Sequence, residues 1–84
     1  MMFTQHAQQR CQQRGITEGG VNMIMRYGSE HFASGGALEL CITNKDLERL
    51  KQKHREEERV IRKLLKKAII VDGESIITVY HKTK

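Results

Sequence analysis

Apolar residues near the start of the chain have the spacing of a helix. Ala7 and Cys11 stand four residues apart in a polar stretch, so both fall on one helical face. Thr4 can cap such a helix, and Gly15 can adopt the left-handed conformation that ends one. The pattern therefore predicts a first helix that runs to about Arg14.

A second helix is predicted directly after the first. Thr17 is a suitable capping residue, and Val21, Ile24 and Met25 follow helical spacing. Gly28 is expected to end this helix. Both helices are short, so we expect them to need a sheet to pack against.

The pattern then changes to the period of a strand. Residues 37–43 alternate well enough for a half-buried strand, and residues 29–33 form a candidate partner across a Ser-Gly-Gly turn at 34–36. Residues 68–81 contain two β-branched runs around Asp72-Gly73, which is a strong hairpin signal. The sequence therefore predicts two hairpins.

Residues 44–67, between the hairpins, predict one long basic helix. Its apolar stripe has leucine or isoleucine at both ends, at Leu47, Leu50, Ile61, Leu64 and Leu65. His54 and Glu57 occupy the polar middle of the stripe. Such a helix can pack at its ends and stay hydrated at its centre. Alternatively it can pair with a second copy or a partner, with His54 and Glu57 setting the register.

The predicted order of elements is ααββαββ, which is an α+β fold. Two short N-terminal helices pack on a small antiparallel sheet, and the long basic helix is inserted between the two hairpins. The 84 residues are enough for one small domain over residues 1–84. A domain of this size buries only roughly 60% of its unfolded surface, so a partner that adds buried surface would stabilise it.

The charge of the chain favours an anionic partner. The net charge is +5 and the isoelectric point is about 9.5. Residues 44–67 supply the whole excess, because Lys and Arg balance Asp and Glu in the rest of the chain. RNA is therefore an expected partner. Six residues of this segment are candidates for contact with nucleic-acid phosphates: Arg55, Arg59, Arg62, Lys63, Lys66 and Lys67.

The cysteine content and hydropathy indicate a cytoplasmic protein. Cys11 and Cys41 are widely separated in the sequence, which fits free thiols in a reducing compartment. The first residues lack the pattern of a secretory signal, and no apolar run approaches 18 residues. We therefore expect no membrane segment. The sequence also lacks a convincing set of metal ligands, and we expect no metal and no other cofactor.

One flank of the first predicted helix carries cationic or titratable side chains, namely His6, Arg10 and Arg14. Arg14 is expected to point along the small apolar face, where an unpaired guanidinium would be costly. In one interpretation Arg14 is held by carbonyl groups or by a carboxylate such as Glu30 or Glu39. In the other, the three side chains line a pocket that receives an anion.

Two stretches resemble a family of small bacterial domains of unknown function. They are His-Ala-x-x-Arg-x-x-x-Arg-Gly-Ile at 6–16 and Ile-Ile-Thr-Val-Tyr at 76–80. That family is considered related to the ribonuclease-toxin fold of barnase, EndoU, colicin and RelE. The resemblance implies a helical N-terminus on an antiparallel sheet, with the site between them. By position it implies five site residues: His6, Arg10, Arg14, Thr78 and Tyr80. The long helix at 44–67 is a departure from the family pattern.

The first functional hypothesis is a metal-independent ribonuclease that acts on RNA. Such an enzyme could be the toxin of a toxin–antitoxin pair. His6 would be the general base, Arg10 and Arg14 would hold the phosphate, and Thr78 and Tyr80 would donate hydrogen bonds to it if they face the helix. His81 would then point away. The alternative is a non-catalytic module that binds RNA or protein through the basic helix 44–67. A purely structural homodimer through that helix is a third hypothesis. The expected partners are RNA, an antitoxin protein or a second copy.

Overall fold

The computed structural model describes residues 2–51 and 55–82, with the side chains of residues 55–57 set aside. Its elements begin with a short strand that the sequence pattern did not predict. In chain order they are β1 (Met2–Phe3), α1 (Gln5–Arg14), α2 (Glu18–Tyr27), β2 (Ser29–Phe32), the 3-10 turn η1 (Ser34–Gly36), β3 (Leu38–Cys41), α3 (Asn44–Lys51), α4 (Arg55–Arg62), β4 (Lys67–Asp72) and β5 (Ser75–His81).

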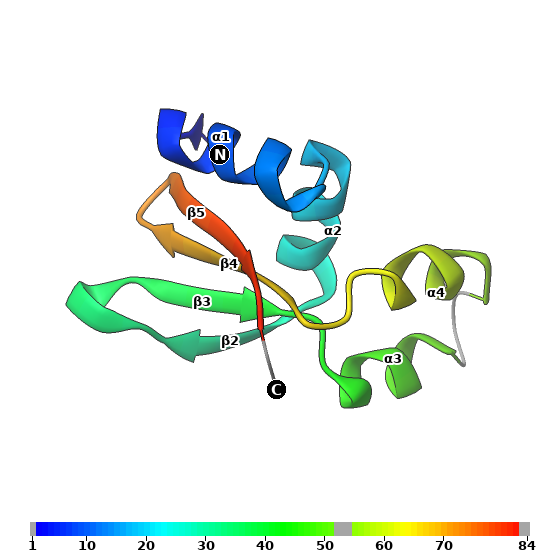
Figure 1. Cartoon of the computed structure of the whole chain (residues 1–84). Helices are drawn as coiled ribbons and strands as arrows, with labels where there is room; N and C mark the ends of the chain where they lie inside the picture. Colours follow the sequence, from blue (N-terminus) through cyan, green and yellow to red (C-terminus); the bar gives the residue numbers. More distant parts are fainter. Residues whose placement is uncertain (1, 52–54, 83–84) are drawn as a thin grey trace.

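The described strands form one sheet in the order β1-β5-β4-β3-β2 (Figure 1). The β2–β3 and β4–β5 hairpins and the β3–β4 pair are antiparallel, as predicted. β1 pairs with β5 in parallel, with Met2 opposite Ser75 and Phe3 opposite Ile76. The fold is therefore α+β, but the sheet is mixed rather than purely antiparallel.

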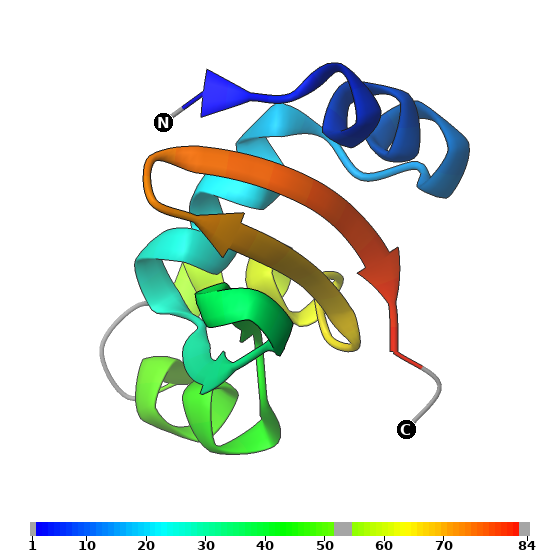
Figure 2. The ribbon, with the colours of Figure 1, turned by 90° about the vertical axis from the view of Figure 1, so that its left-hand side faces the viewer.

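The two N-terminal helices begin and end as the sequence predicts. The Thr4 hydroxyl accepts a hydrogen bond from Ala7 N, and the Thr17 hydroxyl accepts one from Gly20 N. Gly15 ends α1 with φ of 67°, the left-handed conformation that glycine adopts without strain. α1 packs along β5, and α2 packs against β3 and β4 (Figures 1 and 2).

The helices and one face of the sheet share a single core. On the sheet side this core contains Leu40, Ile69, Val71, Ile76 and Val79, and side chains from all four α-helices pack against them. Side chains alternate between faces along each strand, so the neighbours of these residues lie on the opposite face. We call that opposite face, which carries Glu39, Ile70, Thr78 and Tyr80, the outer sheet face. All four of these side chains are half-buried.

A β-bulge in β5 decides which of its residues face the core. Val71 pairs with Ile76 and Ile70 pairs with Thr78, so Ile77 has no partner on β4. The extra residue brings Ile76 and Val79 to the same face although they are three positions apart. Both are fully buried, whereas Ile77 is 36% exposed.

The prediction of one helix over residues 44–67 is wrong. The structure describes two helices of eight residues each, α3 and α4, which pack against each other beyond the ends of the sheet strands (Figure 1). Leu47 and Leu50 from α3 enter the same core as Ile61 and Leu64 from the α4 end. A continuous helix of this length would separate its two apolar ends, whereas the fold-back buries both of them.

The C-terminal end of the predicted helix also differs. The last residues of the segment form a turn, in which Lys66 has φ of 68°, and Lys67 is the first residue of β4. Residues 52–54, including His54, lie outside the described residues, and so does the side chain of Glu57. Their predicted role in setting the register of a dimer therefore stays a prediction.

A buried carboxylate joins α3 to the sheet. Asp46, with 2% of its surface exposed, accepts hydrogen bonds from the Thr43 backbone and hydroxyl and from the Ser29 hydroxyl. Arg49 lies 2.6 Å from the same carboxylate. These partners compensate the burial of the charge and fix the start of α3 against β2.

Candidate functional site

The predicted catalytic residues of the first helix lie together on α1. Arg10 Nε donates to His6 Nε2 over 3.4 Å, and Arg10 Nη1 donates to Gln13 Oε1 over 3.4 Å. His6 is exposed and Arg10 is half-buried. In this contact the His6 nitrogen accepts from the guanidinium. The helix therefore presents an imidazole beside a guanidinium.

Arg14 does not point into the core as the sequence suggested. Its side chain is exposed and has no hydrogen bond or ion pair in the described part of the chain. The proposed partners Glu30 and Glu39 do not reach it: Glu30 is exposed, and Glu39 bonds to other residues. Arg14 is in the last turn of α1, beside the end of β5, where the sheet no longer covers it.

His81 faces the helix, contrary to expectation. Its Nε2 lies 3.0 Å from the backbone carbonyl oxygen of Arg14. A carbonyl oxygen only accepts hydrogen bonds, so His81 Nε2 carries the hydrogen and donates. The contact joins the C-terminal end of α1 to the end of β5.

Thr78 and Tyr80 share a face, as predicted, but this face is directed away from α1. Val79 between them is fully buried in the core, so its two neighbours point to the outer sheet face. Thr78 is paired with Ile70, and the Tyr80 hydroxyl donates to Glu39 Oε2. The five predicted site residues therefore do not converge, because the sheet separates His6, Arg10 and Arg14 from Thr78 and Tyr80.

Three polar side chains meet on the outer sheet face, and we call them the outer-face cluster: Glu39 on β3, Tyr80 on β5, and Lys82 directly after β5. Tyr80 donates to one oxygen of the Glu39 carboxylate. Lys82 Nζ donates to the other over 2.8 Å. The Glu39 carboxylate is therefore held from both sides, with 17% of its side chain exposed.

The hydrogen bond from Lys82 to Glu39 raises the pKa of the Lys82 ammonium, although partial burial opposes the shift. Lys82 therefore keeps its positive charge at neutral pH. Cys41 Sγ lies 4.0 Å from Lys82 Nζ. Burial raises the pKa of the Cys41 thiol more than the nearby ammonium lowers it, so this cysteine is a poor nucleophile at neutral pH.

A histidine stands beside the outer-face cluster. His31 on β2 is the direct antiparallel partner of Glu39 on β3. Directly opposed residues in such a pair project to the same face, with Cβ atoms roughly 5 Å apart. The His31 side chain is exposed. The outer sheet face thus presents a carboxylate, an imidazole, a phenol and an ammonium.

A hollow of about 230 Å³ lies at the end of the outer sheet face. Lys66 and Lys82 line it, together with Cys41 and the residues that begin α3. Lys66 is exposed at this hollow and makes it a candidate position for a phosphate group, whereas the Lys82 ammonium is already paired with Glu39.

The predicted phosphate-binding residues do not share one helix. Arg59 and Arg62 are on α4, Lys63 and Lys66 follow it, and Lys67 is on β4. Arg62 forms an ion pair with Glu58, which reduces its availability for a phosphate. Arg59, Lys63 and Lys66 are exposed. The side chain of Arg55 lies outside the described residues.

Sequence reasoning missed the outer-face cluster. The sequence pattern suggests Glu39 only as a possible partner for Arg14 and indicates no role for His31 or Lys82. The alternation around Glu39, between Leu38 and Leu40, was the available signal that it faces away from the core.

Within residues 2–51 and 55–82, no group of three or more His, Cys, Asp or Glu side chains is arranged to hold a metal ion. In the same part of the chain, no helix combines the length and the apolar character needed to cross a membrane. Neither a family model, nor a curated protein, nor a solved structure matches the chain. The resemblance of residues 6–16 and 76–80 to the bacterial domain family therefore stays a prediction.

Proposed function

We propose that the protein cleaves RNA without a metal ion and that the outer sheet face is its active surface. The observation that carries this proposal is the Glu39 carboxylate, which is held by Tyr80 and Lys82 on a face outside the core. An oriented carboxylate beside an exposed imidazole, His31, provides the two kinds of group that acid–base cleavage requires.

In the proposed reaction Glu39 is the general base and His31 is the general acid. The Glu39 carboxylate accepts the proton of a ribose 2′-hydroxyl while that oxygen forms a bond to the adjacent phosphorus. The bond from phosphorus to the 5′-oxygen breaks, and protonated His31 gives its proton to the leaving oxygen. The products are a 2′,3′-cyclic phosphate and a 5′-hydroxyl, so no co-reactant is needed.

Lys82 and Tyr80 have supporting roles in this proposal. The Lys82 ammonium, whose pKa is raised, would stabilise the negative charge that develops on the phosphorane oxygens. Tyr80 would keep the Glu39 carboxylate in position through its hydrogen bond. The net charge of +5 and the lysine-lined hollow beside the cluster favour a polyanionic substrate.

The resemblance described above places the same chemistry on α1 instead. There His6 would be the base, and Arg10 and Arg14 would bind the phosphate. The flank is exposed, so it is a rival location for the reaction, although Thr78 and Tyr80 cannot contribute to it from the opposite face. Cleavage of cellular RNA at either location would inhibit growth. This would fit the toxin of a toxin–antitoxin pair, with an antitoxin protein as a further partner.

One assay distinguishes the two locations. Purified protein is incubated with a mixed-sequence RNA in EDTA, and the cleavage ends are mapped. Glu39→Gln and His31→Ala test the outer sheet face, whereas His6→Ala and Arg14→Ala test α1. Glu30→Gln is the matched control, because Glu30 is an exposed carboxylate on β2 whose register partner is the core residue Leu40.

The proposal predicts that Glu39→Gln and His31→Ala each lower the cleavage rate by roughly 10²-fold or more. The three other variants should keep the wild-type rate. Loss of activity in His6→Ala and Arg14→Ala alone would move the site to α1. RNA left intact by folded wild-type protein would overturn the enzymatic proposal at both locations.

A second candidate function is RNA binding without cleavage. The exposed cations Arg59, Lys63 and Lys66 in and after α4 favour it. Reversing Arg59 and Lys63 to glutamate should then abolish RNA binding in a gel-shift titration, and the affinity of the wild type should fall steeply with salt. Binding that survives the double reversal would contradict this function.

A further inference from the structure

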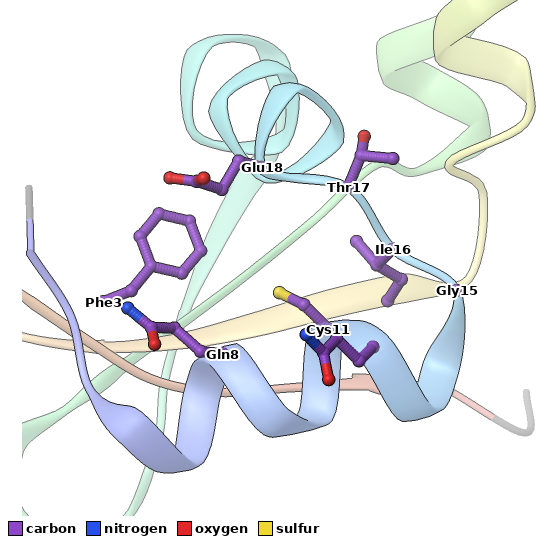
Figure 3. Close-up of a pocket in the computed structure, with 8 residues that line it drawn as sticks. Phe3, Gln8, Cys11, Gly15, Ile16, Thr17 and Glu18 are labelled. Atoms are coloured by element: carbon purple, nitrogen blue, oxygen red, sulfur yellow. The ribbon is translucent and has the colours of Figure 1, made fainter.

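A hollow of about 510 Å³ lies between α1 and the beginning of α2, and the proposed reaction does not use it (Figure 3). Phe3, Cys11 and Ile16 form its apolar part. Gln8 and Gln12 line its α1 side, and by helical geometry these two face away from the flank that carries His6 and Arg10. The volume is within the range of small-molecule sites.

Three polar side chains at this hollow, Glu18, Gln8 and Gln12, are available to a ligand. Glu18 and the amides of Gln8 and Gln12 form no side-chain hydrogen bond or ion pair in the part of the chain that the structure describes. Figure 3 shows the Glu18 carboxylate and the Gln8 amide on the same side of the hollow as the Phe3 ring. In contrast, the carboxylates of Glu39, Asp46 and Glu58 are all paired.

The hollow is locally anionic although the chain is basic. Glu18 is the single charged residue among its described lining residues, and no lysine, arginine or histidine borders it. The pKa of the Cys11 thiol is raised by burial and, secondarily, by the Glu18 charge. The negative potential of the Glu18 carboxylate therefore extends to the apolar part of the hollow. This potential disfavours an anionic ligand.

We propose that the hollow between α1 and α2 binds a small organic cation with a flat apolar body. The apolar body would lie against Phe3, Cys11 and Ile16. Its ammonium or amidinium group would pair with Glu18, and the carbonyl oxygens of Gln8 and Gln12 would accept further N–H bonds. This site is independent of the proposed function, because none of its residues belongs to the outer-face cluster.

The probe for the test is benzamidinium, which combines an aromatic ring with a planar cation. Backbone amide shifts of ¹⁵N-labelled protein are followed during titration, with benzyl alcohol and benzoate as neutral and anionic comparisons. We expect saturable shifts at Phe3, Cys11 and Ile16 with a Kd on the order of 1 mM, as for a probe of this size. Benzyl alcohol should bind several-fold more weakly, and benzoate should not bind.

Three variants test whether benzamidinium binds at this hollow and pairs with Glu18. Glu18→Gln should weaken benzamidinium binding roughly threefold to fivefold, the range of an exposed ion pair. Gln8→Trp, a change at an exposed position, should abolish binding because the indole fills the hollow. Glu74→Gln, an exposed carboxylate in the β4–β5 turn, should bind as the wild type does.

Alkylation of Cys11 by iodoacetamide is an independent readout, measured in a Cys41→Ala background so that only Cys11 reacts. We expect the alkylation rate to fall at saturating benzamidinium. Equal affinity for benzamidinium and benzyl alcohol, or unchanged affinity in Glu18→Gln, would overturn the cation preference. Shifts that do not saturate, or that persist in Gln8→Trp, would overturn the site itself.

Discussion

The Tyr80 hydroxyl donates a hydrogen bond to the Glu39 carboxylate across the intervening strand β4. The contact links β5 to β3 on the outer sheet face, and Lys82 holds the other carboxylate oxygen. This one carboxylate therefore connects the two hairpins of the sheet.

Removing the Tyr80 hydroxyl should destabilise the protein modestly. Tyr80→Phe keeps the ring and leaves Glu39 with Lys82 as its remaining partner, so we expect a loss of about 0.5–1.5 kcal/mol in the free energy of unfolding. Urea denaturation followed by circular dichroism measures it. No loss in Tyr80→Phe would mean that water replaces the hydrogen bond without penalty.

The ion pair of Lys82 with Glu39 should make stability depend on alkaline pH. The folded-state pKa of Lys82 is raised above its usual value of 10.5. The stabilisation is therefore fully present below that value and is lost as pH rises through the raised pKa. We expect Lys82→Met to be less stable than wild type by up to about 1 kcal/mol at pH 8, with the difference shrinking above about pH 10.5. A difference that stays constant through this alkaline range would contradict the ion pair.

Two adjacent isoleucines provide a matched test of the bulge. Ile76 is fully buried and Ile77 is 36% exposed. Ile76→Ala should cost about 2–5 kcal/mol of stability because it leaves a cavity in the core, whereas Ile77→Ala should cost less than about 1 kcal/mol. Thermal or urea unfolding of both variants decides the matter. Similar losses would show that β5 does not alternate as described.

The Thr4 hydroxyl makes two hydrogen bonds, and substitution of Thr4 should lower the stability of the protein through the loss of both. Its hydroxyl accepts from Ala7 N at the start of α1 and donates to the Ile77 carbonyl over 3.1 Å. Thr17 caps α2, and in the described part of the chain its hydroxyl makes no second hydrogen bond of this kind. Thr4→Ala should therefore cost about 1–2 kcal/mol, more than Thr17→Ala, in urea unfolding. The reverse order would argue against the contact with β5.

The fold-back of α3 and α4 can be measured directly. Spin labels replace Lys45 and Arg62, near the start of α3 and at the end of α4. A continuous helix would separate these backbone positions by about 26 Å, whereas two packed antiparallel helices would bring them to roughly 10–15 Å. Pulsed electron paramagnetic resonance reports the distance after allowance for the label arms. A distribution centred on the longer separation would restore the single helix.

Local signals made most of the elements predictable. Thr4 and Gly15 mark the two ends of α1, because capping depends on residues within one turn. The Asp72-Gly73 turn identified the β4–β5 hairpin. β1 was not predicted because a strand of two residues is too short to show an alternation of apolar and polar positions. The bulge was missed because Ile76 and Ile77 are identical in hydropathy, and only the pairing with β4 distinguishes them.

The long helix was predicted for a related reason. Leu47, Leu50, Ile61 and Leu64 fit a single helical stripe as well as they fit two short ones, so spacing alone does not locate the fold-back. On α1, the placement of His6 and Arg10 on one flank was predictable from their i,i+4 spacing. The outer-face cluster joins Glu39 to Tyr80, which are 41 residues apart in the chain, and no local pattern contains that information.

The parallel pairing of β1 with β5 has a consequence for biosynthesis. Met2 N donates to the Glu74 carbonyl over 2.8 Å, and Thr4 N donates to the Ile76 carbonyl over 3.0 Å. The backbone groups of β1 are therefore matched only when β5, which is synthesised later, is available. Until β5 leaves the ribosome, α1 has no strand to pack on, so this domain acquires its native structure only after β5 has been synthesised.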